Sequence, residues 1–309
     1  MIEARAVSKR YGDKTAVDGL TFTVKPGVVT GFLGPNGAGK STTIRMIMGL
    51  DAPTSGTVTV NGKRYDELSA PLREVGALLE AKAVHTGRSA YNHLLALALT
   101  TGIPQRRVDE VIDLVGLRDV ARKRVGGFSL GMGQRLGVAA ALLGDPATLV
   151  LDEPVNGLDP QGILWIRNLL RGLAAEGRTV FVSSHLMSEM ALTAEHLIVI
   201  GKGRLIADSS VNEFIERASS KVVRVRTQQA TELRDLLAGA GVDITSVEPG
   251  LIQVRGLDGA AIGRVACRNA IALEELTPVQ ASLEEAFMEL TDDALEYRVT
   301  ATAQERRAS

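Results

Sequence analysis

The residues with the clearest chemical role lie in one glycine-rich stretch near the N-terminus. They are Gly34, Pro35, Asn36, Gly37, Ala38, Gly39, Lys40, Ser41 and Thr42, called here the P-loop. An apolar segment at 28–33 precedes them and a helical segment at 43–48 follows, which is the context of the phosphate-binding pattern GxxxxGKS/T. The glycines let backbone N–H groups converge on a diphosphate, Lys40 can reach the β- and γ-phosphates, and the Ser41 hydroxyl can bind Mg²⁺. The pattern predicts a nucleoside triphosphate site, because Thr42 stands where a dinucleotide motif needs its third glycine.

Two carboxylates and a histidine follow apolar strands further along the chain. Asp152 and Glu153 end the apolar segment at 147–151, and His185 follows the strand predicted at 179–182. Acidic groups at the end of a buried strand are costly unless they are used at the edge of the sheet. Asp152 is placed to hold Mg²⁺, directly or through water, and Glu153 to accept a proton from an attacking water. A lone histidine at a strand end is usually structural, but beside these acids we expect His185 to contact the γ-phosphate.

Two further positions each allow a structural and a functional interpretation. Ser129 is a good N-cap for the apolar helix predicted at 136–143, after a glycine-rich loop. This segment is either a capped helix after a flexible turn or a second helix N-terminus that faces a phosphate. Tyr11 is either a half-buried aromatic residue at a strand end or a platform on which adenine stacks.

Length and composition limit the classes of function. The 309 residues suggest about two domains, and a formal net charge of −1 with interspersed acids and bases predicts no nucleic-acid partner. The single cysteine, Cys267, excludes an intrachain disulfide and fits a reducing compartment. We find no apolar leader and no run of about 18 uncharged apolar residues. We therefore expect the chain by itself to be soluble and cytoplasmic.

The hydrophobic pattern predicts an α/β domain with a helical insertion. Strands are expected at 2–7, 20–24, 28–33, 56–61, 75–79 and 147–151, and again at 179–182. Between the strand at 75–79 and the strand at 147–151 lie helices at 89–100, 106–115 and 136–143, which form an insertion at about 81–145. A further helix is expected at 161–174.

Taken together, these motifs resemble the nucleotide-binding subunit of an ATP-binding cassette (ABC) transporter over roughly residues 1–217. The Walker A motif is GPNGAGKST, the Walker B motif is TLVLDEP, the D-loop is NGLDP and the switch histidine is His185. SLGMGQ stands in place of the LSGGQ signature, with Leu130 for a glycine and Met132 for a glutamine, and Glu80 replaces the glutamine that usually closes the strand near position 80. These departures resemble the drug- and antibiotic-exporter branch, of the bacitracin and daunorubicin types.

The resemblance implies a P-loop nucleotide-binding cassette that hydrolyses ATP with Mg²⁺. Phosphoryl transfer is catalysed mainly by positioning and charge stabilisation. One copy is expected to supply the P-loop, Asp152, Glu153 and His185. Ser129 and Gly131 of a second copy are expected to close the same ATP in a head-to-tail dimer. The resemblance also counts Asp159 of the D-loop among the nucleotide-binding residues and Glu80 among the catalytic and Mg²⁺-binding ones.

Export would require a separate membrane-spanning permease, with this chain held peripherally on the inner face of the cell membrane. The rival hypothesis is a soluble ABC-type ATPase that acts on the ribosome or on DNA. Such a protein would usually bring a second cassette, a coiled-coil arm or a basic face, and the sequence shows none of these.

The remainder of the chain, at 218–299, predicts a small accessory module after a linker at 218–220. Strands at 222–227, 244–247, 251–254 and 271–276 and helices at 230–240 and 259–268 give the order β-α-β-β-α-β, which is ferredoxin-like. Ser282 is expected to cap a last helix, and the tail at 300–309 to be disordered.

Overall fold

The computed structural model describes residues 1–80, 84–218, 222–279 and 281–291, and these divide into two compact units. Among the described residues, the first unit covers Met1–Val211 together with Thr291, and the second covers Asn212–Leu290. The division assigns most of α8 (Val211–Ala218) to the second unit, whereas the boundary predicted after residue 217 left it in the first. The tail predicted at 300–309 lies outside the described residues, as does the linker predicted at 218–220 apart from Ala218.

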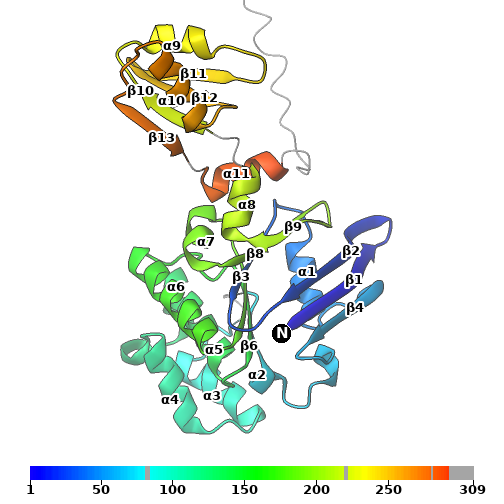
Figure 1. The fold of residues 1–309 in the computed structure, drawn as a ribbon. Helices are drawn as coiled ribbons and strands as arrows, with labels where there is room; N and C mark the ends of the chain where they lie inside the picture. The colour runs from blue at the N-terminus through cyan, green and yellow to red at the C-terminus, as the bar shows by residue number, and fades with distance from the viewer. Residues whose placement is uncertain (81–83, 219–221, 280, 292–309) are drawn as a thin grey trace, which may run out of the picture. The chain divides into compact units, whose positions relative to one another are not determined.

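The centre of the first unit is a six-stranded sheet in the order β5-β6-β7-β3-β8-β9 (Figure 1). All neighbours in it are parallel except β8 and β9, which are antiparallel. Its strands are β3 (Val29–Leu33), β5 (Val75–Leu78), β6 (Thr148–Asp152), β7 (Thr179–Ser183), β8 (His196–Gly201) and β9 (Arg204–Ser210). Because parallel strands point the same way, the segments that follow β3, β6 and β7 all leave one edge of the sheet.

A smaller antiparallel sheet, in the order β2-β1-β4, packs against this centre. Its strands are β1 (Ile2–Tyr11), β2 (Lys14–Val24) and β4 (Ser55–Val60). The first two are longer than predicted, because Tyr11 pairs with Lys14 across a tight turn in which Gly12 has a φ of 57°. Phe22 of this sheet packs against Phe32 and Phe181 of the larger one, with its ring centroid 6.0 and 6.1 Å from theirs, and the rings of Phe32 and Phe181 lie 5.0 Å apart. The two sheets therefore share one hydrophobic core.

Three helices form the predicted insertion: one, α5, packs against β5, and the other two, α3 and α4 at the lower left of Figure 1, pack against α5. They are α3 (Ala90–Thr100), α4 (Gln105–Leu114) and α5 (Leu130–Leu142). The other helices of the first unit are α1 (Lys40–Ile47), α2 (Pro71–Glu74), α6 (Pro160–Ala175) and α7 (Met187–Thr193), and 3₁₀ turns lie at Tyr65–Glu67, Arg118–Val120 and Val125–Gly127.

The helix α5 begins at Leu130, six residues earlier than the predicted start at 136. The glycines in this stretch do not interrupt the helix, because they allow it to pack closely against its neighbours. A Cβ on Gly137 would lie 2.5 Å from the Leu78 side chain, so glycine lets α5 approach β5 closely.

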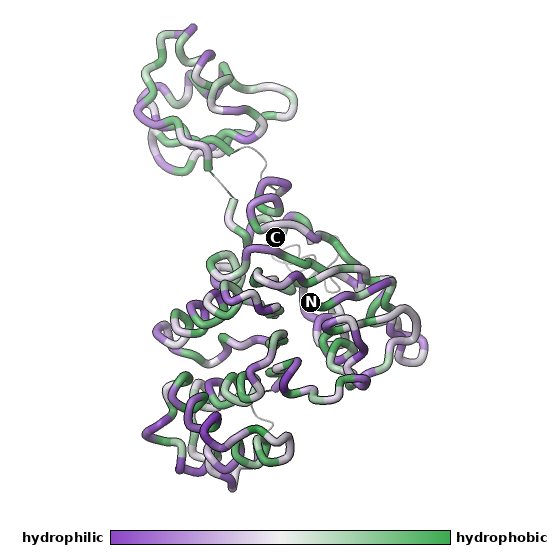
Figure 2. The backbone as a smooth tube through the Cα atoms, turned by 60° about the horizontal axis from the view of Figure 1, so that its bottom comes forward, coloured by the Kyte–Doolittle hydropathy of each residue, from purple (hydrophilic) through white to green (hydrophobic). Residues whose placement is uncertain are grey.

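Figure 2 shows short hydrophobic segments interrupted by hydrophilic ones along the drawn chain. Within the described ranges no helix combines the length and apolar character needed to cross a membrane.

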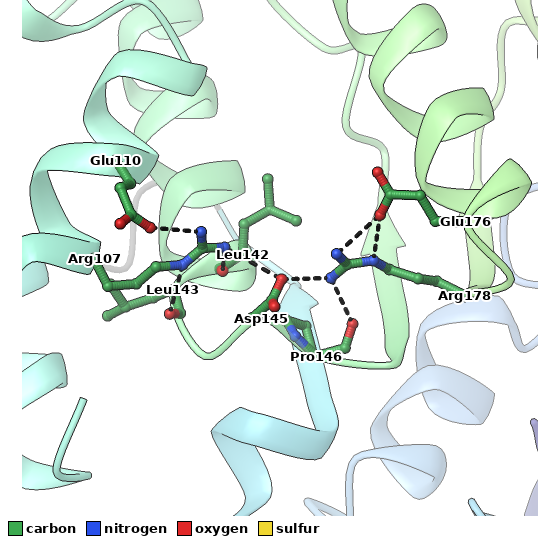
Figure 3. A network of polar contacts seen from close by, with 8 residues as sticks. All are labelled: Arg107, Glu110, Leu142, Leu143, Asp145, Pro146, Glu176 and Arg178. Atoms are coloured by element: carbon green, nitrogen blue, oxygen red, sulfur yellow. Dashed lines mark hydrogen bonds and ion pairs between the residues drawn. The ribbon is translucent and has the colours of Figure 1, made fainter. Parts of the chain in front are cut away.

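A polar network joins the helical insertion to the amino ends of β6 and β7 (Figure 3). Asp145 accepts hydrogen bonds from Arg107 of α4 at 3.4 Å and from Arg178, in the turn before β7, at 2.8 Å. Arg107 also donates to the Leu142 carbonyl at 3.0 Å, at the end of α5. The Asp145 carboxylate therefore connects three segments that are distant in sequence. The backbone of Asp145 is in the left-handed region, with a φ of 54°.

We predict that Asp145→Asn lowers the free energy of unfolding by about 0.5–1 kcal/mol at pH 7, a modest value because the carboxylate is largely exposed. Asparagine tolerates the left-handed backbone, so only the charge is lost. The hydrogen bond from Arg178 lowers the pKa of Asp145 in the folded state. Its stabilisation is therefore complete above the ordinary carboxyl pKa and is lost as the pH falls through the lower, folded-state pKa.

Urea unfolding at pH 7 and in acid, with the exposed turn variant Asp13→Asn as control, measures this effect. A cost for Asp145→Asn that is equal at both pH values would contradict the electrostatic explanation.

The second unit contains a four-stranded antiparallel sheet in the order β11-β12-β10-β13. In chain order its elements are β10 (Val222–Arg226), α9 (Ala230–Leu237), β11 (Asp243–Glu248), β12 (Leu251–Arg255), α10 (Gly259–Arg268), β13 (Glu275–Val279) and α11 (Leu283–Thr291). Helices α9 and α10 contribute Leu233 and Ile262 to a core with Val225 and Val254 of the sheet.

The predicted strand at 271–276 is wrong in its position. Ile271 is buried and its N–H donates to the Ala266 carbonyl at 2.9 Å, so this residue belongs to the turn that follows α10 and not to a strand. The strand begins later, at Glu275.

Candidate nucleotide-binding site

The P-loop connects β3 to α1, and its glycines are required by close backbone contacts. Gly39 has a φ of 103°, and a Cβ there would lie 2.6 Å from the Ala16 carbonyl oxygen. A Cβ on Gly34 would lie 2.5 Å from the Ile200 carbonyl oxygen. The loop therefore holds a fixed backbone curve at the N-terminus of α1, where unpaired N–H groups and the helix dipole favour an anion.

Lys40 is held over this loop by the loop's own backbone. Its Nζ donates to the Gly34 carbonyl at 2.6 Å and to the Pro35 carbonyl at 3.2 Å. Burial lowers the pKa of the Lys40 ammonium, whereas the charges of Glu153 and Asp152 act in the opposite direction. The predicted phosphate-binding lysine thus lies in the electric field of the predicted general base, Glu153, and of the predicted Mg²⁺ ligand, Asp152.

Asp152 and Glu153 are fixed by the neighbouring strand β7. The buried Ser183 hydroxyl donates to the Asp152 carboxylate and accepts the Glu153 N–H at 3.0 Å. Sequence reasoning did not select Ser183. The sequence does show that Ser183 is a hydroxyl residue at the end of the strand before His185. Its role becomes visible only when β6 and β7 pair, because Asp152 then lies opposite Ser183.

The Glu153 carboxylate lies in direct contact with His185. Oε2 of Glu153 is 2.7 Å from Nδ1 of His185 and also accepts the His185 backbone N–H at 3.3 Å. Glu153 has a left-handed φ of 51°, and its carbonyl accepts a hydrogen bond from Nε2 of the buried Gln134 at 2.9 Å. A strained backbone held by several partners is typical of residues whose exact orientation matters.

Gln134 was missed as a site residue, although it belongs to the SLGMGQ stretch that the sequence singled out. Its buried amide needs a partner, and that partner is the backbone of Glu153. The N-terminal part of α5 is therefore hydrogen-bonded, within one chain, to the segment that carries Asp152 and Glu153.

The predicted signature and D-loop residues form a second group. The Ser129 hydroxyl accepts the Met132 N–H at 3.2 Å, which confirms the predicted N-cap, and Asp159 caps α6 by accepting the Gly162 N–H at 2.8 Å. A Cβ on Gly131 would lie 2.8 Å from the Gly157 carbonyl oxygen. The start of α5 is thus in contact with the D-loop that leads into α6, and Asp159 has a structural function as the N-cap of α6.

Tyr11 and Glu80 lie at the surface. The Tyr11 hydroxyl donates to Asp51 at 2.8 Å, and this bond raises the pKa of Tyr11. The Lys9 ammonium lies 5.0 Å from the ring centroid. Glu80 is exposed just beyond β5, which pairs with β6 through Leu78 and Leu151. Adenine stacking by Tyr11 and the role of Glu80 stay predictions.

The predicted Mg²⁺ ligands Ser41, Asp152 and Glu80 come from three segments. In the ranges that the structure covers, no three His, Cys, Asp or Glu side chains are grouped so that they could hold a metal ion by themselves. A hydroxyl and a carboxylate that share the ion with phosphate oxygens fit the chemistry of Mg²⁺, which is held by few protein ligands and by substrate phosphates.

Two family models match the sequence. Residues 17–156 match the model described as ABC transporter, and residues 221–284 match one described as a domain of unknown function, DUF8746. The first match contains the P-loop, Asp152 and Glu153, and the second falls within the accessory unit.

Relatives match over almost the whole chain. The uncharacterized ABC transporter ATP-binding protein YhcH of Bacillus subtilis (strain 168) is 38% identical over 96% of this chain and 97% of its own length. The bacitracin transport ATP-binding protein BcrA of Bacillus licheniformis is 37% identical over 94% of this chain and 97% of its own length. Among solved structures, a dimeric post-hydrolysis state of the ATP-binding cassette MJ0796 bound to ADP and Pi covers 68% of this chain and 98% of its own, with 23% identity and a TM-score of 0.63. The last match is a likeness of fold.

Proposed function

Because the chain belongs to the family of ABC transporter ATP-binding proteins, we propose that it hydrolyses ATP at the P-loop to energise export of an antibiotic or other small molecule through a separate permease. It is an ATP hydrolase of the ABC type. The observation that carries the proposal is the placement of Lys40, Asp152, Glu153 and His185 at one edge of the sheet, with Glu153 and His185 2.7 Å apart.

Each residue has a distinct proposed task. The P-loop N–H groups and Lys40 bind the phosphates, and Glu153 accepts the proton of the attacking water. His185 holds the Glu153 carboxylate and contacts the γ-phosphate. Ser41 and Asp152 would hold Mg²⁺, and Glu80 lies at the same carboxyl-terminal edge of the sheet as Asp152. The ion would neutralise part of the charge of the phosphates. Tyr11 would stack on adenine.

A second copy would complete the site. Ser129, Gly131 and Asp159 of that copy would face the ATP bound by the first, so that two helix N-termini act on one triphosphate. The dimeric state of the cassette that the first unit resembles in fold supports this arrangement. ATP would then join the copies, and hydrolysis would release them.

The chain would lie on the inner face of the cell membrane through its permease. The second unit, with its β-α-β-β-α-β order and antiparallel sheet, fits a ferredoxin-like module of structural or regulatory use. Action on the ribosome or DNA is not favoured, because BcrA is named for bacitracin transport.

Two measurements test the proposed function. The purified chain should hydrolyse MgATP, and a membrane-spanning permease that co-purifies with it should stimulate that rate in reconstituted vesicles. If the chain was recovered with ribosomes or DNA rather than with an integral membrane protein, the export assignment would be wrong.

We predict that Glu80→Ala binds ATP but loses stimulation by the permease, whereas Glu80→Gln retains it. Glutamine keeps an acceptor oxygen and adds an amide donor, while the alanine side chain carries no polar group. The ATPase rates of the three versions, with and without the reconstituted permease, measure the difference. Equal stimulation of the parent and of Glu80→Ala would remove Glu80 from the coupling of the two subunits.

A further inference from the structure

One arginine and one tryptophan connect three helices of the first unit. The Arg135 guanidinium of α5 lies 4.4 Å from the ring centroid of Trp165 on α6. Arg135 Nη1 donates to the Val115 carbonyl at 2.9 Å, and Trp165 Nε1 donates to the Leu114 carbonyl at 3.3 Å. Leu114 and Val115 form the C-terminus of α4. Both side chains thus stack on each other and bond to the end of the same helix.

The chemistry of this contact needs both residue types. The last carbonyls of a helix lack partners within it, and a cation there is favoured by the helix dipole. Indole is the best aromatic partner for a cation, and the planar guanidinium can stack on a ring while it donates hydrogen bonds at its edge. Lysine at position 135 or an aliphatic residue at 165 would lose part of this arrangement.

The contact also lies at matching distances from two helix starts. Ser129 begins α5 and Asp159 begins α6, and Arg135 and Trp165 each follow their N-cap by less than two helical turns. Nearer the N-cap of α5, Gly131 lies against Gly157 of the loop that precedes α6. The N-terminal part of α5 is therefore in contact at two points with the segment formed by this loop and the first two turns of α6.

We propose that Arg135 and Trp165 are positioning residues that set the spacing between Ser129 and Asp159, and hence the surface on which a second copy closes. This inference rests on the proposed dimeric function. The two residues act on the signature and D-loop side, whereas ATP is bound by the P-loop side of the same chain. Loss of the contact should weaken closure of the dimer without weakening ATP binding to the single copy.

The experiment uses the full chain with Glu153→Gln, so that bound ATP is retained. In this parent, Trp165→Leu, Trp165→Phe, Arg135→Gln and Arg135→Lys are compared by sedimentation with MgATP, and ATP binding is measured at protein concentrations too low for dimers. We expect Trp165→Leu and Arg135→Gln to need about tenfold more protein to dimerise, with ATP affinity within twofold of the parent. Trp165→Phe keeps an aromatic face and should recover part of the loss.

Leu164→Ala is the matched control, because Leu164 is the neighbouring, exposed residue of α6. Since Trp165 is the only tryptophan of the chain, its fluorescence reports the contact directly in the parent and in Arg135→Gln, which leaves the indole in place. The emission should change on dimer formation in the parent and should already be altered in Arg135→Gln without nucleotide.

If the Arg135 and Trp165 variants dimerised at the same protein concentration as the Leu164→Ala control, the inference would be wrong. The proposed function would still stand. Loss of ATP affinity in step with dimerisation would also overturn it, because a general folding defect would then explain both. If the Glu153→Gln parent itself stayed monomeric with MgATP, the proposed site shared by two copies would be wrong, and so would this inference.

Discussion

Glu153→Gln is expected to bind MgATP but to hydrolyse it slower than the parent by about two to four orders of magnitude, the usual contribution of a general base. This corresponds to an increase in barrier of roughly 3–5.5 kcal/mol. The amide has the shape of the carboxylate and keeps one acceptor for the His185 backbone N–H, so the site geometry is retained while the proton acceptor is lost. Single-turnover hydrolysis with excess enzyme measures the chemical step.

An ATP-bound dimer should also accumulate in this variant, because the reaction that separates the copies is removed. Sedimentation with and without MgATP detects it. Glu110→Gln is the control, since Glu110 is an exposed acid that pairs with Arg107 on α4. If Glu153→Gln hydrolysed ATP at the rate of Glu110→Gln, the assignment of the general base would be wrong.

Lys40→Ala should lower ATP turnover by about two to three orders of magnitude, the range for removing one group that stabilises charge in a transition state, and should weaken nucleotide binding. The change removes the cation aimed at the transferred phosphate. It also removes two hydrogen bonds to the Gly34 and Pro35 carbonyls. Both kcat and the affinity for ATP are measured, because the lysine is expected to act in binding and in catalysis.

The matched control is Lys63→Ala, which removes an exposed lysine of the same unit. Thermal unfolding of both variants separates a loss of the phosphate contact from a loss of folded protein. A folded Lys40→Ala variant that hydrolysed ATP at the parent rate would show that the P-loop is not the phosphate site.

The amino-acid sequence by itself determined the segments whose structure depends on near neighbours. The P-loop follows from glycines that allow a left-handed backbone at Gly39 and from a helix that starts directly after it. Ser129 could be assigned as an N-cap because capping links residues three positions apart. The roles of four site residues were predicted from the order of motifs, which places Asp152, Glu153 and His185 at strand ends. The same order places Lys40 at the start of the helix after the P-loop.

The tertiary structure alone decided which distant residues share a hydrogen bond. Ser183 reaches Asp152 because β7 pairs with β6, and Gln134 reaches the Glu153 carbonyl because α5 packs beside the same edge. No local pattern encodes these contacts, since they depend on strand order and register rather than on neighbouring residues. The start of β13 was misplaced for the same reason, because the burial of Ile271 in the turn that follows α10 overrides its preference for a strand. The stack of Arg135 on Trp165 likewise exists only because α4, α5 and α6 meet in the folded chain.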